Sequence, residues 1–306
     1  MNKKILFIVK LAVFFFSFVW LIFCKAMPQY STSYNAAIND KYARLKNINE
    51  PKIILVGDSN IAFGFDSKMV QDAFDMPVVN FGLHGGLGQA FHTNTIKKYI
   101  REGDIVVIAP AGYQSNGNDY DYVLAWMTIE NNIKLLIDSS AGHYLDMFKA
   151  FPTYLRKLLH LFIRGTENAM LNDQYDRLMF NEFGDNIYPR PECIIVGDKY
   201  DSFYASDSLS KEMRDYWNDY NKYIISKKAH LFMSCPPILQ ETLTVDLCDM
   251  QKQLENELEF PVIAELENYI YPLELFFDTG FHLNDHGKIL RTEQFINDLK
   301  SILDID

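Results

Sequence analysis

The chain has 306 residues, of which 48% are hydrophobic and 23% are charged, and its formal net charge is −11. This ordinary globular composition argues against disorder, collagen-like repeats and coiled coils, and the length fits one large domain or two modest ones. A nucleic-acid role is disfavoured, because an acidic body has no electrostatic attraction for a phosphate backbone. The 4 scattered cysteines are too few for a disulfide framework or a CxxC zinc site.

The first feature along the chain is an apolar run at residues 5–24, which contains one lysine and one serine. A helix of that length, at about 1.5 Å per residue, spans a hydrocarbon core of roughly 30 Å. No small-residue cleavage site follows the run, so a removed signal peptide is disfavoured. Lys3 and Lys4 precede it and favour a cytoplasmic N-terminus. The sequence therefore predicts a signal anchor within residues 1–25, with the body outside the cytoplasmic membrane.

After a polar stretch at residues 26–50, which we interpret as a juxtamembrane linker, short apolar runs alternate with helical patterns. The runs lie at 53–56, 78–81, 104–109, 231–234 and 261–264. The helical patterns lie at 66–75, 87–101, 209–227 and 239–258, and a last helix runs from Asp285 to about Leu303. Near-continuous apolar runs are typical of strands that are buried on both faces of a parallel sheet. The alternation predicts an α/β fold with a doubly wound sheet, which makes residues 51–306 one domain.

A long insertion interrupts this alternation at about 113–228, between the third and fourth predicted strands. Because a structureless loop of that size is uncommon in a compact domain, we expect an inserted, mostly helical cap. Its position directly after a strand predicts that it covers the carboxyl edge of the sheet.

The first predicted strand ends in Gly57-Asp58-Ser59-Asn60, and a helix follows. A serine at such a turn lies at the carboxyl edge of the sheet, where α/β folds bind their ligands. Gly57 permits the sharp turn. A phosphate-cradling loop or a plain helix cap also fits this tetrapeptide, since Asp and Ser are both good N-caps.

A second motif lies just before the last helix, where Asp278 precedes His282 by four residues. A carboxylate on the same loop can hold an imidazole in the tautomer that accepts a serine proton. His282 is therefore a candidate general base toward Ser59, with a structural histidine as the alternative. A metal site on a helix is disfavoured, because Gly280 and the cap expected at Asn284 interrupt the helix that it requires.

A glycine-rich segment at residues 80–88 follows the second predicted strand. Gly82 can present its backbone N–H to an oxyanion, because no side chain blocks the approach. A dinucleotide loop is disfavoured, since the glycine spacing departs from G-x-G-x-x-G. A purely structural glycine turn is the alternative.

Together these motifs resemble the SGNH (GDSL-type) hydrolase superfamily, over about 51–112 and 229–306. The resemblance implies a flavodoxin-like three-layer α/β/α sandwich around a parallel sheet, to which this chain adds the helical insertion and the N-terminal transmembrane helix. It implies roles for the matching residues: Ser59 is the nucleophile, Asp278 and His282 are the terminal acid and base, Gly82 is the oxyanion glycine, and Gly57, Asp58 and Asn60 complete the first motif.

The chain departs from the family pattern at two points. No asparagine stands where the family's third motif places the oxyanion donor, which leaves Gln114 as the preferred candidate and Asn116 and Asn118 as alternatives. The terminal pair is one residue wider than the usual Asp-x-x-His, so either Asp278 orients His282 differently or a backbone carbonyl orients it.

The anchor, the NFGLHGG segment and the ending DTGFHLNDHGKILRT look most like a branch found with cell-surface polysaccharide and teichoic-acid modification systems. Members of that branch are similar to anchored partners of membrane-bound O-acyltransferases. This implies a serine O-acetyltransferase or esterase that acts on an extracytoplasmic glycan through an acyl-serine intermediate, with no cofactor and no metal. The alternative is an SGNH-fold binding or assembly partner in which the site is degraded.

Overall fold

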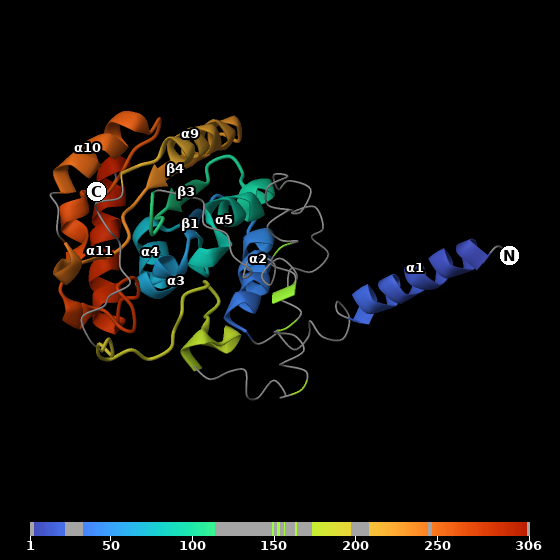
Figure 1. The fold of residues 1–306 in the computed structure, drawn as a ribbon. Coiled ribbons are helices and arrows are strands. Elements are labelled where there is room, and N and C mark those ends of the chain that lie inside the picture. The colour runs from blue at the N-terminus through green and yellow to red at the C-terminus, as the bar shows by residue number, and fades with distance from the viewer. Residues whose placement is uncertain are drawn as a thin grey trace.

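The computed structural model describes residues 3–21, 33–113, 173–196, 208–243 and 247–304, together with the single positions 149, 152, 153, 156 and 163. These residues form a mixed α/β structure in which helices surround a parallel sheet (Figure 1). The predicted α/β class is therefore confirmed.

Four parallel strands form the sheet in the order β2-β1-β3-β4. Their bounds are Ile53–Gly57 for β1, Val78–Gly82 for β2, Ile105–Ile108 for β3 and His230–Met233 for β4. The fifth predicted strand, at 261–264, makes only a single parallel bridge, between Val262 and Met233. Pro261 at its start has no N–H to donate, which limits the pairing to a short stretch. A separate two-stranded pair consists of β5 (Ile238–Leu239) and β6 (Ile270–Tyr271).

The helices of the described residues connect and cover these strands. Their bounds are Lys3–Leu21 for α1, Ile38–Asn47 for α2, Ser59–Gly64 for α3, Ser67–Phe74 for α4, Gln89–Ile96 for α5, Lys211–Ser226 for α9, Leu247–Glu257 for α10 and Asp285–Ile302 for α11. Short 3-10 turns lie between several of them, including Tyr34–Ala37 before α2 and Arg177–Met179.

Two apolar clusters form the core, one on each face of the sheet. Ile54 and Val56 of β1 belong to the cluster that contains residues of α2, α5, α9 and α10. Ile53 and Leu55 belong to the other cluster, which contains residues of α4 and α11. Successive side chains of a strand point to opposite faces, so β1 is buried on both sides, and this explains its unbroken apolar sequence.

Helix α9 lies within the predicted insertion but belongs to the body. Trp217 and Ile224 on this helix are fully buried in the core, and α9 packs against β4. The described part of the insertion that precedes α9, residues 173–196, contains two short 3-10 turns and no longer helix. The helical cap predicted for the earlier part lies almost entirely outside the described residues.

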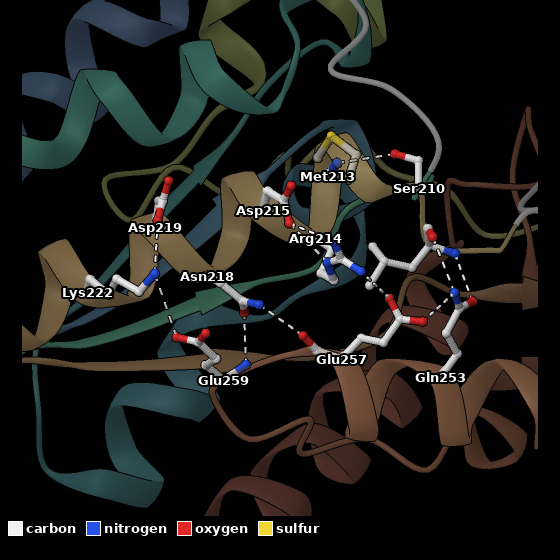
Figure 2. Close-up of polar contacts among 11 residues, drawn as sticks. Ser210, Met213, Arg214, Asp215, Asn218, Asp219, Lys222, Gln253, Glu257 and Glu259 are labelled. Atoms are coloured by element: carbon white, nitrogen blue, oxygen red, sulfur yellow. Dashed lines mark hydrogen bonds and ion pairs between the residues drawn. The ribbon is translucent and has the colours of Figure 1, made fainter.

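Polar contacts join α9 to the end of α10 (Figure 2). The Asn218 side chain donates to the Glu257 carbonyl at 2.9 Å and accepts from the Glu259 N–H at 2.8 Å. Gln253 pairs in the same way with the backbone of Leu209, through contacts of 3.0 and 3.2 Å. These amides satisfy backbone groups at the C-terminal end of α10 and ahead of α9, and they fix the two helices side by side.

Residues 33–47, which we predicted to be part of a polar linker, also belong to the body. Ala37, Ile38 and Leu45 are fully buried in the core cluster on that face of the sheet. Two of its polar side chains, those of Lys41 and Arg44, reach backbone carbonyls of the body instead of solvent. Arg44 Nε donates to the Val78 carbonyl at 2.8 Å. The segment is therefore part of the folded body and not a linker.

Helix α1 carries the apolar run, and Figure 1 shows it as a separate rod. Large apolar side chains are exposed all round it; Phe7, Phe14 and Phe16 are each more than 65% exposed. Within the described part of the chain, no helix combines the length and the apolar character required to cross a bilayer. The predicted span continues to residue 24, and residues 22–24 lie outside the described ranges.

Lys41 of α2 is buried, and its ammonium donates to the carbonyls of Asn80, at 3.0 Å, and Gly184. Burial lowers the pKa of Lys41 to about 7, although the charge of Asp185 opposes this. Between that pH and the ordinary lysine pKa near 10.5, the unfolded chain therefore binds more protons than the folded chain. It follows that the free energy of unfolding rises with pH over this window.

We expect Lys41→Met to flatten this rise, because the substitution removes the group that titrates. Chemical denaturation of the full chain at pH 7 and at pH 10 measures the change in the free energy of unfolding between these pH values. Lys68→Met is the matched control, since Lys68 is exposed and, among the described residues, pairs only with Asp72 on the same helix. An equal pH dependence in wild type and Lys41→Met would contradict the assignment.

Candidate functional site

The turn after β1 places Ser59 at the carboxyl edge of the sheet. β1 ends at Gly57, the Asp58 side chain caps α3 by accepting the Asn60 N–H at 2.9 Å, and Ser59 is the first residue of that helix. β1 pairs with β2 on one side and with β3 on the other. The strand order reverses at β1, and at such a point open α/β sheets bind their ligands.

Asp58 and Asn60 fix the conformation of this turn. The second Asp58 oxygen accepts the Ala111 N–H at 2.9 Å, and the Asn60 amide donates to Asp58 at 2.5 Å and to the Ala109 carbonyl at 2.9 Å. Both side chains are buried. Burial raises the pKa of Asp58, and these hydrogen bonds act in the opposite direction. The residues on either side of Ser59 are therefore tied to the loop after β3, while the Ser59 side chain stays partly exposed.

Arg291 of α11 is a buried residue that the sequence analysis missed. Its guanidinium donates to the Asn60 carbonyl at 2.6 Å, to the Asn60 side chain at 2.9 Å and to the Cys235 carbonyl at 2.8 Å. A Cβ at Gly64 would lie 2.2 Å from this guanidinium, so a side chain there would displace the guanidinium from these hydrogen bonds. The available signal was a charged residue on the same helical face as Phe295, four positions away, which is itself fully buried.

The loop before α11 brings Asp278 to His282. The Nδ1 atom of His282 lies 2.7 Å from Oδ1 of Asp278. The four-residue spacing closes because the backbone folds back: the Phe277 N–H donates to the His282 carbonyl at 2.8 Å, and the His282 N–H donates to Thr279 at 3.3 Å. The wider Asp–His spacing therefore still permits the contact that the sequence led us to expect.

Asp278 is held in its ionised form. Burial by itself raises its pKa, but hydrogen bonds from His282 and Tyr175 outweigh that effect and hold the pKa of Asp278 below its usual value. An ionised carboxylate only accepts hydrogen bonds, so Nδ1 of His282 carries the proton in this pair. That tautomer leaves Nε2 as the basic nitrogen.

His282 lies over the same face of α3 as Ser59. Its ring stacks on Phe63, with ring centroids 4.1 Å apart and planes 9° apart. Phe63 and Ser59 are four residues apart in α3, so their side chains share one face of the helix. Among the described residues, no hydrogen bond joins Ser59 to His282, and Nε2 of His282 has no partner. The fold thus gathers Ser59, His282 and Asp278 at one edge, in a looser arrangement than a closed triad.

Two further side chains of the site come from the described part of the insertion. Tyr175 donates its hydroxyl proton to Oδ2 of Asp278 at 2.6 Å, and the Gln174 amide donates to the same oxygen at 3.0 Å. Nothing in the sequence pattern distinguished Tyr175 from the other aromatic residues around it. The insertion therefore contributes to the site directly.

Gly82 does not offer a free N–H to the site. Its N–H donates to the Asn80 side chain at 3.0 Å, and a Cβ at this position would lie 2.5 Å from the Ala62 backbone nitrogen. Gly82 therefore lets β2 pack closely against α3. Gly85 lies beside Asp58, where an added Cβ would be 3.6 Å from the Asp58 Cβ, and its N–H has no hydrogen-bond partner among the described residues. Within the described ranges, Gly85 and not Gly82 therefore has an unpartnered N–H near the Ser59 turn.

The other predicted oxyanion donors, Gln114, Asn116 and Asn118, lie outside the described residues. The chain that leads to them begins beside the Ser59 turn, through the contact of Ala111 with Asp58. Across the described ranges, no group of three or more His, Cys, Asp or Glu side chains is arranged to hold a metal ion.

No family model, no curated protein and no solved structure matches this chain. The assignment of the site therefore depends on its geometry and on the sequence motifs that the geometry brings together.

Gly82 and Gly85 have different surroundings, so we expect alanine to affect the stability of the protein differently at the two positions. We expect Gly82→Ala to lower the free energy of unfolding by about 1–3 kcal/mol, because the new methyl group meets backbone atoms that cannot move aside. Gly85→Ala meets only an ordinary van der Waals contact and should change that free energy little. Urea denaturation of both variants measures the difference, and equal stabilities would show that α3 does not approach Gly82 this closely.

Proposed function

We propose that this chain is an SGNH-type serine acyl enzyme, either an O-acetyltransferase or an esterase. The observation that carries the proposal is the position of His282, which is paired with Asp278 at 2.7 Å and stacked at 4.1 Å on Phe63 of the short helix that Ser59 begins. The strand order supports it: β2-β1-β3-β4, continued by the bridge at Val262, agrees with the 2-1-3-4-5 order of a flavodoxin-like sandwich.

In the proposed reaction, Ser59 Oγ attacks the carbonyl carbon of an ester while its proton passes to Nε2 of His282. Asp278 stabilises the imidazolium that forms and keeps its orientation. The tetrahedral oxyanion accepts hydrogen bonds from the Gly85 N–H and from one amide among Gln114, Asn116 and Asn118. When the tetrahedral intermediate collapses, the bond to the leaving alcohol breaks, His282 gives its proton to that alcohol, and an acyl-serine remains. Water or a sugar hydroxyl then takes the acyl group by the same steps in reverse.

The proposed substrate is an acylated glycan outside the cytoplasm, and the proposed partner is a membrane-bound O-acyltransferase. Both come from the resemblance of the motifs to the anchored polysaccharide-modification branch. The exposed apolar surface of α1 and the lysines at its start support a membrane location for residues 5–24.

A second candidate is a binding or assembly protein on the same fold. The observation in its favour is that Ser59 and His282, both described, share no hydrogen bond. Catalytic contacts are often long in ligand-free sites and tighten on binding, so this observation does not exclude the enzyme.

Covalent labelling of Ser59 by a fluorophosphonate probe tests the acyl-enzyme proposal. We expect the wild-type protein to be labelled, and Ser59→Ala and His282→Ala to be unlabelled although folded. Asp278→Asn should react about 10²- to 10⁴-fold more slowly, because the neutral amide no longer holds the Nδ1–H tautomer or stabilises the imidazolium. Cys248→Ser, a change at an exposed position remote in sequence from the three motifs, controls for general effects. A folded wild type that resists the probe would favour the binding protein.

A reporter fused after residue 50 tests the location. Because the lysines ahead of the apolar run favour the inside, we expect a reporter that works only outside the cytoplasm to be active there. Activity of a cytoplasmic reporter at the same position would overturn the location and would weaken the glycan assignment.

A further inference from the structure

Asp278 has two oxygens, and each has its own partner. Oδ1 faces Nδ1 of His282 at 2.7 Å, and Oδ2 accepts from the Tyr175 hydroxyl at 2.6 Å. The Gln174 amide adds a third contact, to Oδ2, at 3.0 Å. With both oxygens engaged, rotation of the carboxylate about its terminal bond would break hydrogen bonds at each end. Tyr175 therefore helps to hold the carboxylate plane in the orientation in which one oxygen meets the imidazole.

Tyr175 is suited to act as a permanent donor. Burial and the negative charge of Asp278 both raise the pKa of Tyr175, so the hydroxyl keeps its proton across the physiological range. Its oxygen also lies 3.5 Å from Nδ1 of His282, on the side of the ring that faces Asp278. The hydroxyl thus acts on the acid and not on the basic nitrogen Nε2.

Residues 33–40 hold Tyr175 in place. Ser33 bridges Asp176 in antiparallel fashion, next to Tyr175 in sequence. Arg177 makes a bidentate pair with Asp40, through contacts of 2.6 and 2.7 Å. The ring of Tyr34 packs edge-on against that of Tyr175, with centroids 5.6 Å apart. Bridge, ion pair and ring contact all join the same two segments.

We propose that Tyr175 is a positioning residue for Asp278 and that residues 33–40 form the support that holds it. The inference rests on the proposed function, because it gives Asp278 and His282 their catalytic roles. It gives residues 33–40 a direct part in the geometry of the site. Residues 173–196 of the insertion then serve to orient Asp278.

Tyr175→Phe tests the inference, with Tyr188→Phe as the matched control. Tyr188 lies on the same segment and packs against Phe277, and its hydroxyl has no hydrogen-bond partner among the described residues. With p-nitrophenyl acetate as substrate, we expect Tyr175→Phe to lower kcat roughly 10- to 100-fold, the usual effect of losing a hydrogen bond to a charged group, with KM unchanged. Tyr188→Phe should behave like the wild type.

A spectroscopic measurement tests the same point without any turnover. The proton that Nδ1 of His282 shares with Asp278 should give a low-field proton resonance that is absent in His282→Ala. On acidification it is lost when Asp278 becomes protonated. Because the Tyr175 hydrogen bond helps to lower the pKa of Asp278, Tyr175→Phe should lose the resonance at a higher pH than the wild type or Tyr188→Phe.

A second variant tests whether residues 33–40 support Tyr175. Arg177→Gln removes the ion pair with Asp40 and should shift kcat and the resonance in the same direction as Tyr175→Phe, by a smaller amount. Arg214→Gln, which removes an arginine paired with Asp215 and Glu257 on α9 and α10, is its control.

The outcomes separate the two proposals. If the wild type is not acylated but the Tyr175→Phe variant loses the resonance at a higher pH, the enzyme proposal is overturned and the positioning contact is established. Turnover and resonance in Tyr175→Phe that match Tyr188→Phe would overturn the positioning role, whatever the activity of the wild type.

Discussion

The site depends on a desolvated turn between β1 and α3. Asp58, Asn60 and Arg291 are buried there, and each hydrogen bond that they make replaces one to water. A buried polar group without a partner costs roughly 1–3 kcal/mol, so the network is favourable only when all its members are in place. This requirement ties together three distant parts of the chain: the start of α3, the loop after β3 and the last helix. Ser59 lies in the middle of these parts, which explains how a residue on a short helix is held in a defined place.

Part of this arrangement was predictable from the sequence, and the reason is local. The strands of the sheet are unbroken apolar runs, and such runs can be recognised in the sequence without knowledge of the fold. The turn at Asp58 and Ser59 carries its own capping chemistry, and Asp278 and His282 are close enough in sequence to suggest a pair. In each case the residues that interact, or the pattern that they form, lie within a few positions of one another.

The rest was not predictable, because it depends on contacts between distant segments. Tyr175 is one aromatic residue among many until the fold brings it to Asp278, about 100 positions away. Gly82 and Gly85 lie in one glycine-rich segment, and only the folded chain shows that α3 packs against Gly82 and that the Asn80 side chain accepts its N–H. Residues 33–47 resemble a linker because polar residues separate the ones that are buried, and Lys41 and Arg44 find carbonyl partners that only the folded chain provides.

Incorporation of residues 33–47 into the body also limits how far the site can reach. Helix α1 ends at Leu21 and the body begins at Ser33, so eleven residues separate the two in the chain. Even fully extended, a stretch of that length spans at most about 40 Å. If the apolar run is held in a membrane, residues 22–32 keep the body close to the lipid surface. Whatever the body acts on or binds would then have to come within the reach of this short connection from the membrane.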